Sequence, residues 1–210
     1  TALGVAVLAL PDPAPTLGPA VAANLSAFNL GNPVTGVLLG YRALDTLLET
    51  VVVLLALVGV WSLTPEPYWG GIPGSPPSAP ADDSLVLLAR LLPPVGIVIG
   101  VHIVWVGADA PGGKFQGSTI LAAMWMLVMM AGIAEPPPVS RFSLRVLLAA
   151  GPALFFVVGL AGFALAGSFL AYPEPYAKLL IIVVELVLML SLAATLGLLV
   201  AGPPARESPQ

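Results

Sequence analysis

The stretch NPVTGVLLGYRALDTLLETVVVLLALVGVWSL, residues 32–63, decides the fold. Its charge-free apolar part, from Thr50 to Leu63, has only 14 residues, whereas a helix needs about 20 residues to cross a hydrocarbon layer about 30 Å thick. A spanning helix must therefore extend towards the N-terminus. Asn32 and Pro33 suit a helix start, because asparagine caps a helix and proline fits its first turn. We predict one helix over residues 33–63.

That helix carries three charged residues, Arg42, Asp45 and Glu49, into the membrane. They recur at i, i+3 and i+7, and therefore share one helix face. Charged side chains at membrane depth normally face a bundle interior or a wet cavity, and they mark ion or proton paths. The alternative is a helix end, with Arg42 and Asp45 at the headgroups and only Glu49 inside. We expect the stripe to lie inside the membrane.

The composition is that of an integral membrane protein. Of the 210 residues, 58% are hydrophobic and 9% are charged, whereas soluble domains carry about 25% charged residues. The apolar runs are long and continuous, which excludes an alternating β-barrel. The net charge of −4 argues against nucleic acid as a partner. With no cysteine and one histidine, the chain cannot supply thiolate zinc, iron–sulfur or bis-histidine haem ligands, and we expect no cofactor.

The apolar runs predict an all-α, polytopic membrane helix bundle with five full transmembrane helices and a short N-terminal one. We divide the chain into an N-terminal helical hairpin (1–64), a flexible Pro- and Gly-rich linker (65–83), a four-helix bundle (84–202) and a polar tail (203–210). The predicted helices are 2–10, ended by Pro11, Pro13 and Pro15, then 33–63, 84–107, 118–134, 144–168 and 176–201. Residues 16–31 form a surface connector. By the positive-inside rule, the linker and the C-terminus of this multi-pass plasma (inner) membrane protein face the cytoplasm.

Two polar residues interrupt the later apolar runs. Glu185 lies in LLIIVVELVLML, about ten residues into its helix. It is either a neutral carboxyl hydrogen-bonded to a neighbouring helix or a group that exchanges protons or sodium ions. His102, in GIVIGVHIVWVG, is more often structural, although a histidine near neutral pH also suits a proton relay. Gly96 and Gly100 form a GxxxG pair, which predicts a close helix contact.

The segment GADAPGGKFQGS, residues 107–118, is not a phosphate-binding loop, because Phe115 stands where a serine or threonine must follow the lysine. We predict a glycine-rich break between two antiparallel spans, with Lys114 as a solvated charge at the membrane boundary. The sequence holds no acid–base dyad, nucleophile triad or metal-ligand cluster, so we expect no catalytic or metal-binding residues.

The same segment resembles the signature of the B subunit of multisubunit Mrp-type sodium/proton antiporters, which is a histidine, two residues and then PGGGFQGG. The matching residues are Pro111, Gly112, Gly113, Phe115, Gln116 and Gly117. Lys114 replaces a glycine, and Ala108 stands where the family has its histidine. Glu185 also matches an acidic position of that family. The resemblance covers about residues 84–202.

The opening stretch is similar to the C-terminal end of the antiporter's A subunit and to a small subunit of membrane-bound hydrogenases. The matching residues are Asn32, Val34, Thr35, Val37, Leu38, Tyr41, Arg42, Asp45, Thr46, Leu47 and Glu49. Gly40 replaces an acid, and Ala43 and Leu44 replace a glycine and an aromatic residue. The chain thus looks like a fusion of two subunits.

These resemblances imply a membrane subunit of an Mrp-type cation/proton antiporter module, which stands alone or belongs to a hydrogenase-like or complex-I-like respiratory assembly. Asp45 and Glu49 would hold protons or sodium ions, Arg42 would tune them, and Glu185 would be a second station. His102 is a candidate substitute for the missing histidine. The implied partners are other antiporter-type membrane subunits. The alternatives are a structural subunit that seals and spaces the ion-pumping subunits, and an independent small transporter or membrane enzyme.

Overall fold

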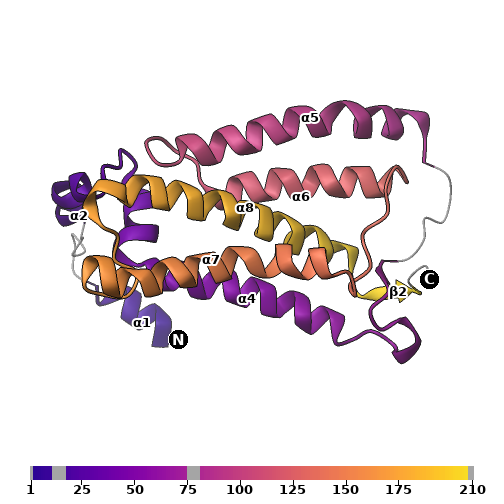
Figure 1. Ribbon diagram of the computed structural model, residues 1–210, viewed down its shortest axis with the longest axis horizontal. Helices are drawn as coiled ribbons and strands as arrows, with labels where there is room; N and C mark the ends of the chain where they lie inside the picture. The colour runs from indigo at the N-terminus through magenta and orange to yellow at the C-terminus, as the bar shows by residue number, and fades with distance from the viewer. Residues whose placement is uncertain (1, 11–17, 75–80, 208–210) are drawn as a thin grey trace.

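The computed structural model describes residues 2–10, 18–74 and 81–207, and it is a bundle of long helices (Figure 1). The predicted helical membrane fold is confirmed. Four of the described segments are long and apolar enough to cross a membrane: α4 (Ala43–Trp61), α5 (Asp83–Val106), α7 (Phe142–Ala166) and Glu174–Ala201, which contains α8 (Ala177–Ala201). A fifth, α6 (Lys114–Met130), runs beside them but has only 17 residues.

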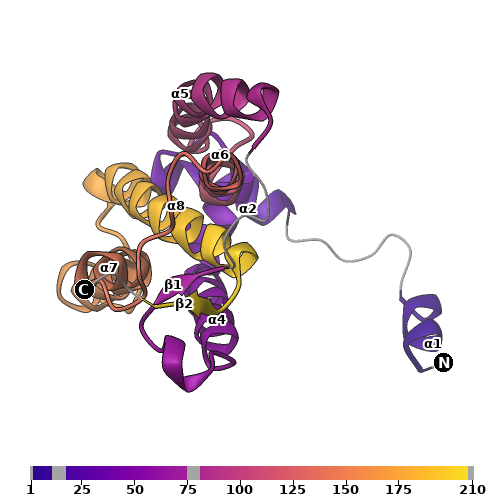
Figure 2. The same ribbon diagram turned by 90° about the vertical axis from the view of Figure 1, so that its right-hand side faces the viewer.

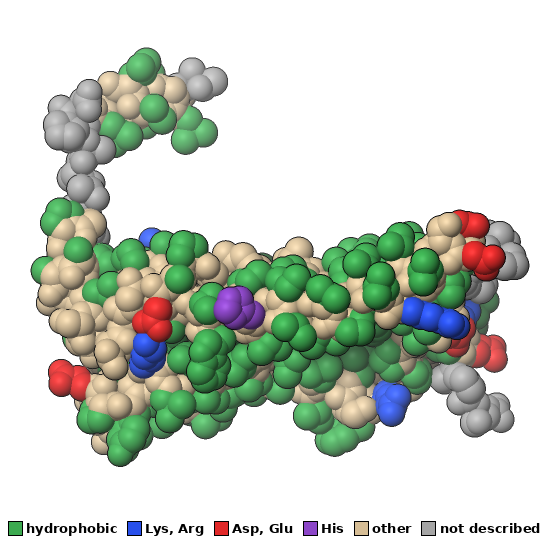
Figure 3. Space-filling model, turned by 90° about the horizontal axis from the view of Figure 1, so that it is seen from above, with side chains coloured by type: hydrophobic (Ala, Val, Ile, Leu, Met, Phe, Trp, Pro, Cys, Tyr) green, Lys and Arg blue, Asp and Glu red, His purple; other side chains and the backbone are tan. Residues whose placement is uncertain are grey.

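Helix α8 is the centre of the bundle and contacts α4, α5, α6 and α7. It is apolar on all sides, and such a helix is stable only when it is surrounded. Of its most apolar window 56% is buried, against 17% for α5, which lies at the outside of the bundle (Figures 1 and 2). The outward leucines and valines of α5 leave an apolar surface. Figure 3 shows charged side chains gathered towards the two ends of that surface, as a membrane protein requires.

The predicted GxxxG contact is confirmed, because Gly96 and Gly100 are both buried against α6. A Cβ atom at Gly96 would lie 2.4 Å from the Cγ atom of Met124. Across the same contact, a Cβ atom at Gly117 would lie 2.9 Å from the carbonyl oxygen of Gly100. The absence of side chains at these glycines lets the two backbones approach closely.

The prediction of one continuous helix over residues 33–63 is wrong. The stretch forms α3 (Pro33–Thr35), a π-helical turn η2 (Gly36–Tyr41) and then α4, with a break at Arg42, whose φ is −125° and ψ is 35°. The start was predicted correctly, since the side chain of Asn32 caps α3 and Pro33 is its first residue. The break places Arg42 at the start of α4, as in the helix-end alternative.

Thr46 stabilises this break. In the π-helical turn the N–H of Arg42 donates to the carbonyl of Val37, 2.8 Å away. The neighbouring carbonyl of Leu38 instead accepts a hydrogen bond of 2.6 Å from the hydroxyl of Thr46, which is 1% exposed. π-helical turns are rare overall, and those that occur are often found at functional sites. This turn is therefore a candidate feature of the site.

Replacement of Thr46 by valine is expected to destabilise the protein by about 1–3 kcal/mol, because it leaves the Leu38 carbonyl without its donor. The thermal unfolding midpoint of the detergent-purified protein should fall. The control variant Thr46→Ser keeps the hydroxyl and should stay close to the wild-type midpoint. An unchanged midpoint in the valine variant would show that the hydroxyl does not support the turn.

The predicted linker and tail are partly structured. Within residues 65–83 the chain forms η3 (Glu66–Tyr68) and β1 (Ile72–Pro73), and β1 pairs antiparallel with β2 (Pro204–Arg206) of the predicted tail. Sequence composition did not reveal this pairing, because the two strands are about 130 residues apart. Residues 75–80 of the predicted linker and residues 208–210 of the tail lie outside the described residues, as do Pro11, Pro13 and Pro15.

The N-terminal segment differs from the predicted hairpin. Helix α1 (Ala2–Leu8) is exposed along its whole length and stands apart from the bundle in Figure 2. The surface connector consists of α2 (Gly18–Asn24) and η1 (Leu25–Phe28). From Leu30 onwards the chain joins the main core, in which Leu39, Ala43 and Leu47 pack with residues of α7 and α8. The first predicted part, from Leu30 onwards, therefore shares a hydrophobic core with the second part, 84–202.

Candidate functional site

The loop between α5 and α6, residues 107–113, is held by the stretch that begins at Asn32. The side-chain amide of Asn32 donates to the carbonyl of Gly107 at 2.9 Å, and the hydroxyl of Thr35 donates to the same oxygen at 2.6 Å. The backbone N–H of Asn32 donates to the carbonyl of Ala108. Both side chains are buried. The two sequence motifs singled out above are therefore in direct contact.

Two of the three glycines of this loop, Gly112 and Gly113, are required by its shape. A Cβ atom at Gly112 would lie 2.3 Å from the carbonyl oxygen of Ile103, and Gly113 has a φ of +137°, which L side chains rarely adopt. The tight turn brings the start of α6 against the middle of α8. There the backbone N–H of Lys114 donates to Oε1 of Glu185 at 3.3 Å.

Lys114 and Glu185 form a buried pair, which we call the Lys114–Glu185 centre. The two residues are 3% and 4% exposed. The ammonium group of Lys114 lies 4.6 Å from the centroid of the Phe115 ring and interacts electrostatically with the carboxylates of Glu185 and Glu49. Opposite charges buried together compensate part of the cost of leaving water. The prediction that Lys114 is solvated is wrong, because the glycine turn carries it inside the bundle.

Arg42 and Asp45 lie at a second place, at the N-terminal end of α4. They form an ion pair with each other, and their side chains are 69% and 53% exposed. Both line a cavity of about 600 Å³, together with Tyr172 from the segment between α7 and α8. Asp45 also belongs to the candidate span that begins at Ala43. The Arg42–Asp45 pair is therefore accessible to water and lies at the edge of a candidate membrane span.

The position of the missing family acid, Gly40, is filled by an aromatic ring. A Cβ atom at Gly40 would lie 2.8 Å from Cζ of Phe28. That ring packs edge-to-face on Tyr41 with centroids 5.3 Å apart. A carboxylate at position 40 would displace Phe28, so the glycine at this position makes room for the ring.

The remaining predicted residues lie on α4, on α5 and around the turn that leads into α6. Glu49 is exposed on α4, one turn beyond Asp45, and its charge acts on Lys114. His102 is exposed on the outer face of α5, surrounded by hydrophobic side chains (Figure 3). No hydrogen bond or ion pair joins it to another residue of the described chain. Pro111 is exposed in the turn, and Phe115 is half-buried beneath the ammonium of Lys114.

Several residues of the site were not found from the sequence. Asp109 and Lys178 form an ion pair of 2.7 Å between the 107–113 loop and the start of α8, and the hydrogen bond from Lys178 lowers the pKa of Asp109. Ser118 donates to the carbonyl of Lys114 at 2.5 Å. Tyr172 is 7% exposed. The Asp109–Lys178 contact joins residues that are 69 positions apart, so no local pattern signals it.

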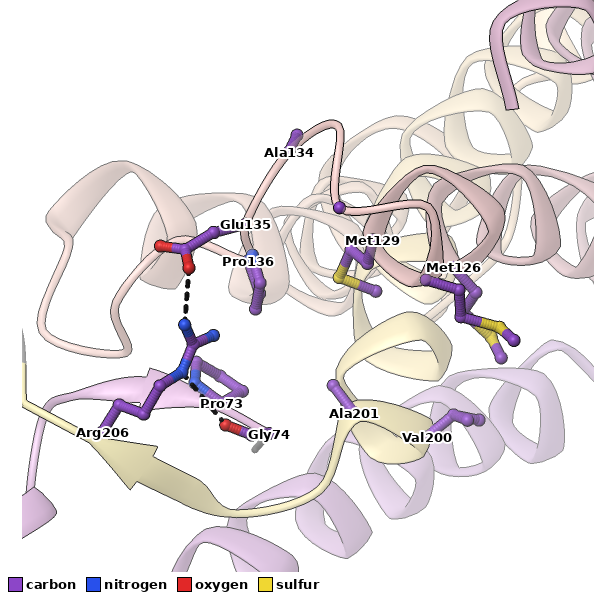
Figure 4. Close-up of a pocket in the computed structure, with 12 residues that line it drawn as sticks. Pro73, Gly74, Met126, Met129, Ala134, Glu135, Pro136, Val200, Ala201 and Arg206 are labelled. Carbon is purple, nitrogen blue, oxygen red and sulfur yellow. Dashed lines mark hydrogen bonds and ion pairs between the residues drawn. The ribbon is translucent and has the colours of Figure 1, made fainter. Parts of the chain in front are cut away.

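Another cavity, of about 610 Å³, lies at the ends of α6 and α8 near the β1–β2 ribbon. Met126, Met129, Val200 and the Glu135–Arg206 ion pair line it (Figure 4). It contains none of the predicted site residues. Among residues 2–10, 18–74 and 81–207, no group of three His, Cys, Asp or Glu side chains is placed to hold a metal ion.

The family described as a domain related to the MnhB subunit of the Na⁺/H⁺ antiporter matches residues 84–203. An uncharacterized protein of Methanocaldococcus jannaschii is 29% identical over 164 residues, which are 70% of this chain and 62% of that protein. The chain thus spans less than two thirds of this curated relative.

Two solved structures have a similar fold. One is the Mrp complex of Dietzia sp. DQ12-45-1b, in which one chain has 26% identity and a TM-score of 0.67, over 100% of this chain and 25% of that one. The other is an archaeal respiratory membrane complex, the membrane-bound sulfane sulfur reductase, with 23% identity and a TM-score of 0.64 over 91% of this chain and 90% of the matched chain. The second likeness shows the fold alone.

Proposed function

This chain belongs to the family of domains related to the MnhB subunit of Na⁺/H⁺ antiporters, and from this premise we propose that it is a membrane subunit of an Mrp-type cation (sodium)/proton antiporter module. The observation that carries the proposal is the Lys114–Glu185 centre. A buried carboxyl that accepts a hydrogen bond from the backbone N–H of a buried lysine, deep in a helix bundle, is the arrangement expected of an ion or proton path rather than of simple packing. Coupled transport then depends on neighbouring membrane subunits.

In this proposal the acidic residues act in sequence. Asp45, paired with Arg42, meets water in the cavity at the end of α4. Glu49 lies one turn further along the same helix, and Glu185 is the buried station. Because Lys114 interacts with both Glu49 and Glu185, a change of charge at one carboxylate alters the energy of a proton or sodium ion at the other.

We also propose that the chain unites two segments related to different antiporter subunits, residues 1–64 and 84–202. In support, the MnhB-related match covers only the second segment, whereas a single chain of the Dietzia complex matches all of this one. We retain five full spans, with α6 as the shortest, and a short N-terminal helix. Arg141, Arg145 and Arg206 at the β1–β2 end support a cytoplasmic C-terminus.

The test is antiport by membrane vesicles that contain the whole complex. Replacement of the exposed Glu49 by glutamine is expected to reduce cation-dependent proton movement strongly, because the amide cannot release a proton. The complex should still assemble and co-purify with the tagged chain. A matched control is Glu66→Gln, an exposed glutamate in the short helix η3 at the other end of α4, which should leave antiport unchanged.

The competing function is a structural subunit whose carboxylates hold helices together. In that case Glu49→Gln would weaken assembly or lower the thermal midpoint, and transport per assembled complex would stay at the wild-type level. Full antiport in the variant would remove Glu49 from the path. The likeness to an archaeal respiratory complex leads us to include redox subunits in the search for co-purifying partners.

A further inference from the structure

Two buried polar atoms beside the proposed path have no hydrogen-bond partner in the described part of the chain. They are Oε2 of Glu185 and the hydroxyl oxygen of Tyr172. The residues are 4% and 7% exposed. A buried polar group without a partner costs about 1–3 kcal/mol, and buried groups of this kind are normally satisfied by protein or by ordered water. The two groups are close enough for the charge of Glu185 to act on Tyr172, so a single partner placed between them satisfies both atoms.

The fold places Tyr172 between Glu185 and the open cavity. Its ring packs in the same core cluster as Ile181 and Leu188, which lie one turn before and one turn after Glu185 on α8 and share its helix face. Tyr172 also lines the cavity of about 600 Å³ that holds the Arg42–Asp45 pair. Tyr172 therefore belongs to the buried core around Glu185 and also lines the cavity that holds the Arg42–Asp45 pair.

The charges around Glu185 favour water over a sodium ion as the missing partner. Lys114 from α6 already supplies a buried positive charge beside this carboxylate, and Glu49 from α4 acts on Lys114 in turn. A second cation next to an ammonium group is repelled strongly in a medium of low dielectric constant. A water molecule is neutral, and it can accept from one hydroxyl while donating to a carboxylate.

We propose that an internal water joins the hydroxyl of Tyr172 to Oε2 of Glu185, and that Tyr172 is the positioning residue through which protons reach Glu185 from the cavity. The inference rests on the proposed function and deepens it. In the relay, the Glu185 carboxylate takes a proton from the water, and the water takes the hydroxyl proton of Tyr172. The phenolic oxygen then recovers a proton from cavity water, so Tyr172 and the internal water end unchanged.

Infrared difference spectroscopy of the complete, reconstituted complex tests the link. The C=O stretching band of Glu185 is identified by its disappearance in Glu185→Gln. Replacement of Tyr172 by phenylalanine keeps the ring and removes the hydroxyl. We expect this variant to shift the Glu185 band and to slow proton uptake by Glu185 by about a hundredfold, the lower end of what a positioned proton-transfer group contributes. The control Tyr176→Phe, at an exposed tyrosine of η4 (Glu174–Tyr176), should match the wild type in both.

Two results would overturn the inference. The first is an unchanged Glu185 band and an unchanged uptake rate in Tyr172→Phe. The second is a wild-type band that shifts with sodium concentration at constant pH, which would identify a cation site. The spectrum reads Glu185 directly, whether or not the complex catalyses antiport. A failure of the proposed function, seen as absent antiport or an unaffected Glu49→Gln variant, is therefore distinguishable from a failure of the water link.

Discussion

Glutamine in place of Glu185 is expected to reduce antiport by the complex to the background of vesicles without it. The amide has nearly the shape of the carboxyl group, and its oxygen can still accept the N–H of Lys114, now 3.3 Å from Oε1. It cannot bind or release a proton, and it carries no charge for a sodium ion. The measurement is cation-dependent proton movement in vesicles, normalised to the amount of assembled complex.

The single variant also leaves the buried ammonium of Lys114 with less compensating charge, which costs as much as 3–5 kcal/mol when a buried pair loses one partner. The double variant Glu185→Gln with Lys114→Gln removes both charges and should recover most of the thermal midpoint. It should not recover antiport. Should transport return together with stability, Glu185 would be a packing residue and the structural alternative would be favoured.

Replacement of Gly112 by valine is expected to prevent the native fold. Its Cβ atom would lie 2.3 Å from the backbone carbonyl oxygen of Ile103, and a backbone atom cannot move aside as a flexible side chain can. Overpacking against side chains already costs about 1–3 kcal/mol, and this clash lies at or above that range. The loop would open, and Lys114 would lose its position against Glu185.

The measurement is the amount of folded chain in detergent extracts, with the thermal midpoint of what remains. Gly59→Ala is the matched control, because nothing lies within 4 Å of its Cβ position in α4. Since alanine favours helix over glycine by about 1 kcal/mol, that variant should be as stable as the wild type or more so. A Gly112→Val protein with a wild-type midpoint would contradict the described loop.

The sequence allowed the long helices to be located because each apolar run ends at prolines, glycines or charges. The predicted spans 84–107, 144–168 and 176–201 agree with α5, α7 and α8 within two residues. Helix α6 spans Lys114–Met130 instead of the predicted 118–134, and its early start has one cause. A lysine next to a glycine turn was expected in water, and the carboxylate that accompanies it is 71 residues away.

The break at Arg42 could not be predicted from helical periodicity. The π-helical turn keeps the residues in a helix-like path. The hydroxyl that donates to the freed carbonyl of Leu38 belongs to Thr46, eight residues later. The sequence offered Glu185 and Gly112 as candidates because the family resemblance marks them, and their roles stay predictions. Tyr172 and Asp109 were not found, because only the packing of α8 reveals their roles.

The hydrogen bonds from Asn32 and Thr35 to the 107–113 loop are made within one polypeptide. A tether between two modules raises their effective concentration to about the millimolar range. A few hydrogen bonds and a shared core then suffice, whereas two separate proteins need a specific interface of roughly 1,200 Å² or more. In the proposed fusion, covalent linkage also fixes the ratio of the two segments at one to one, so neither is inserted into the membrane without its counterpart.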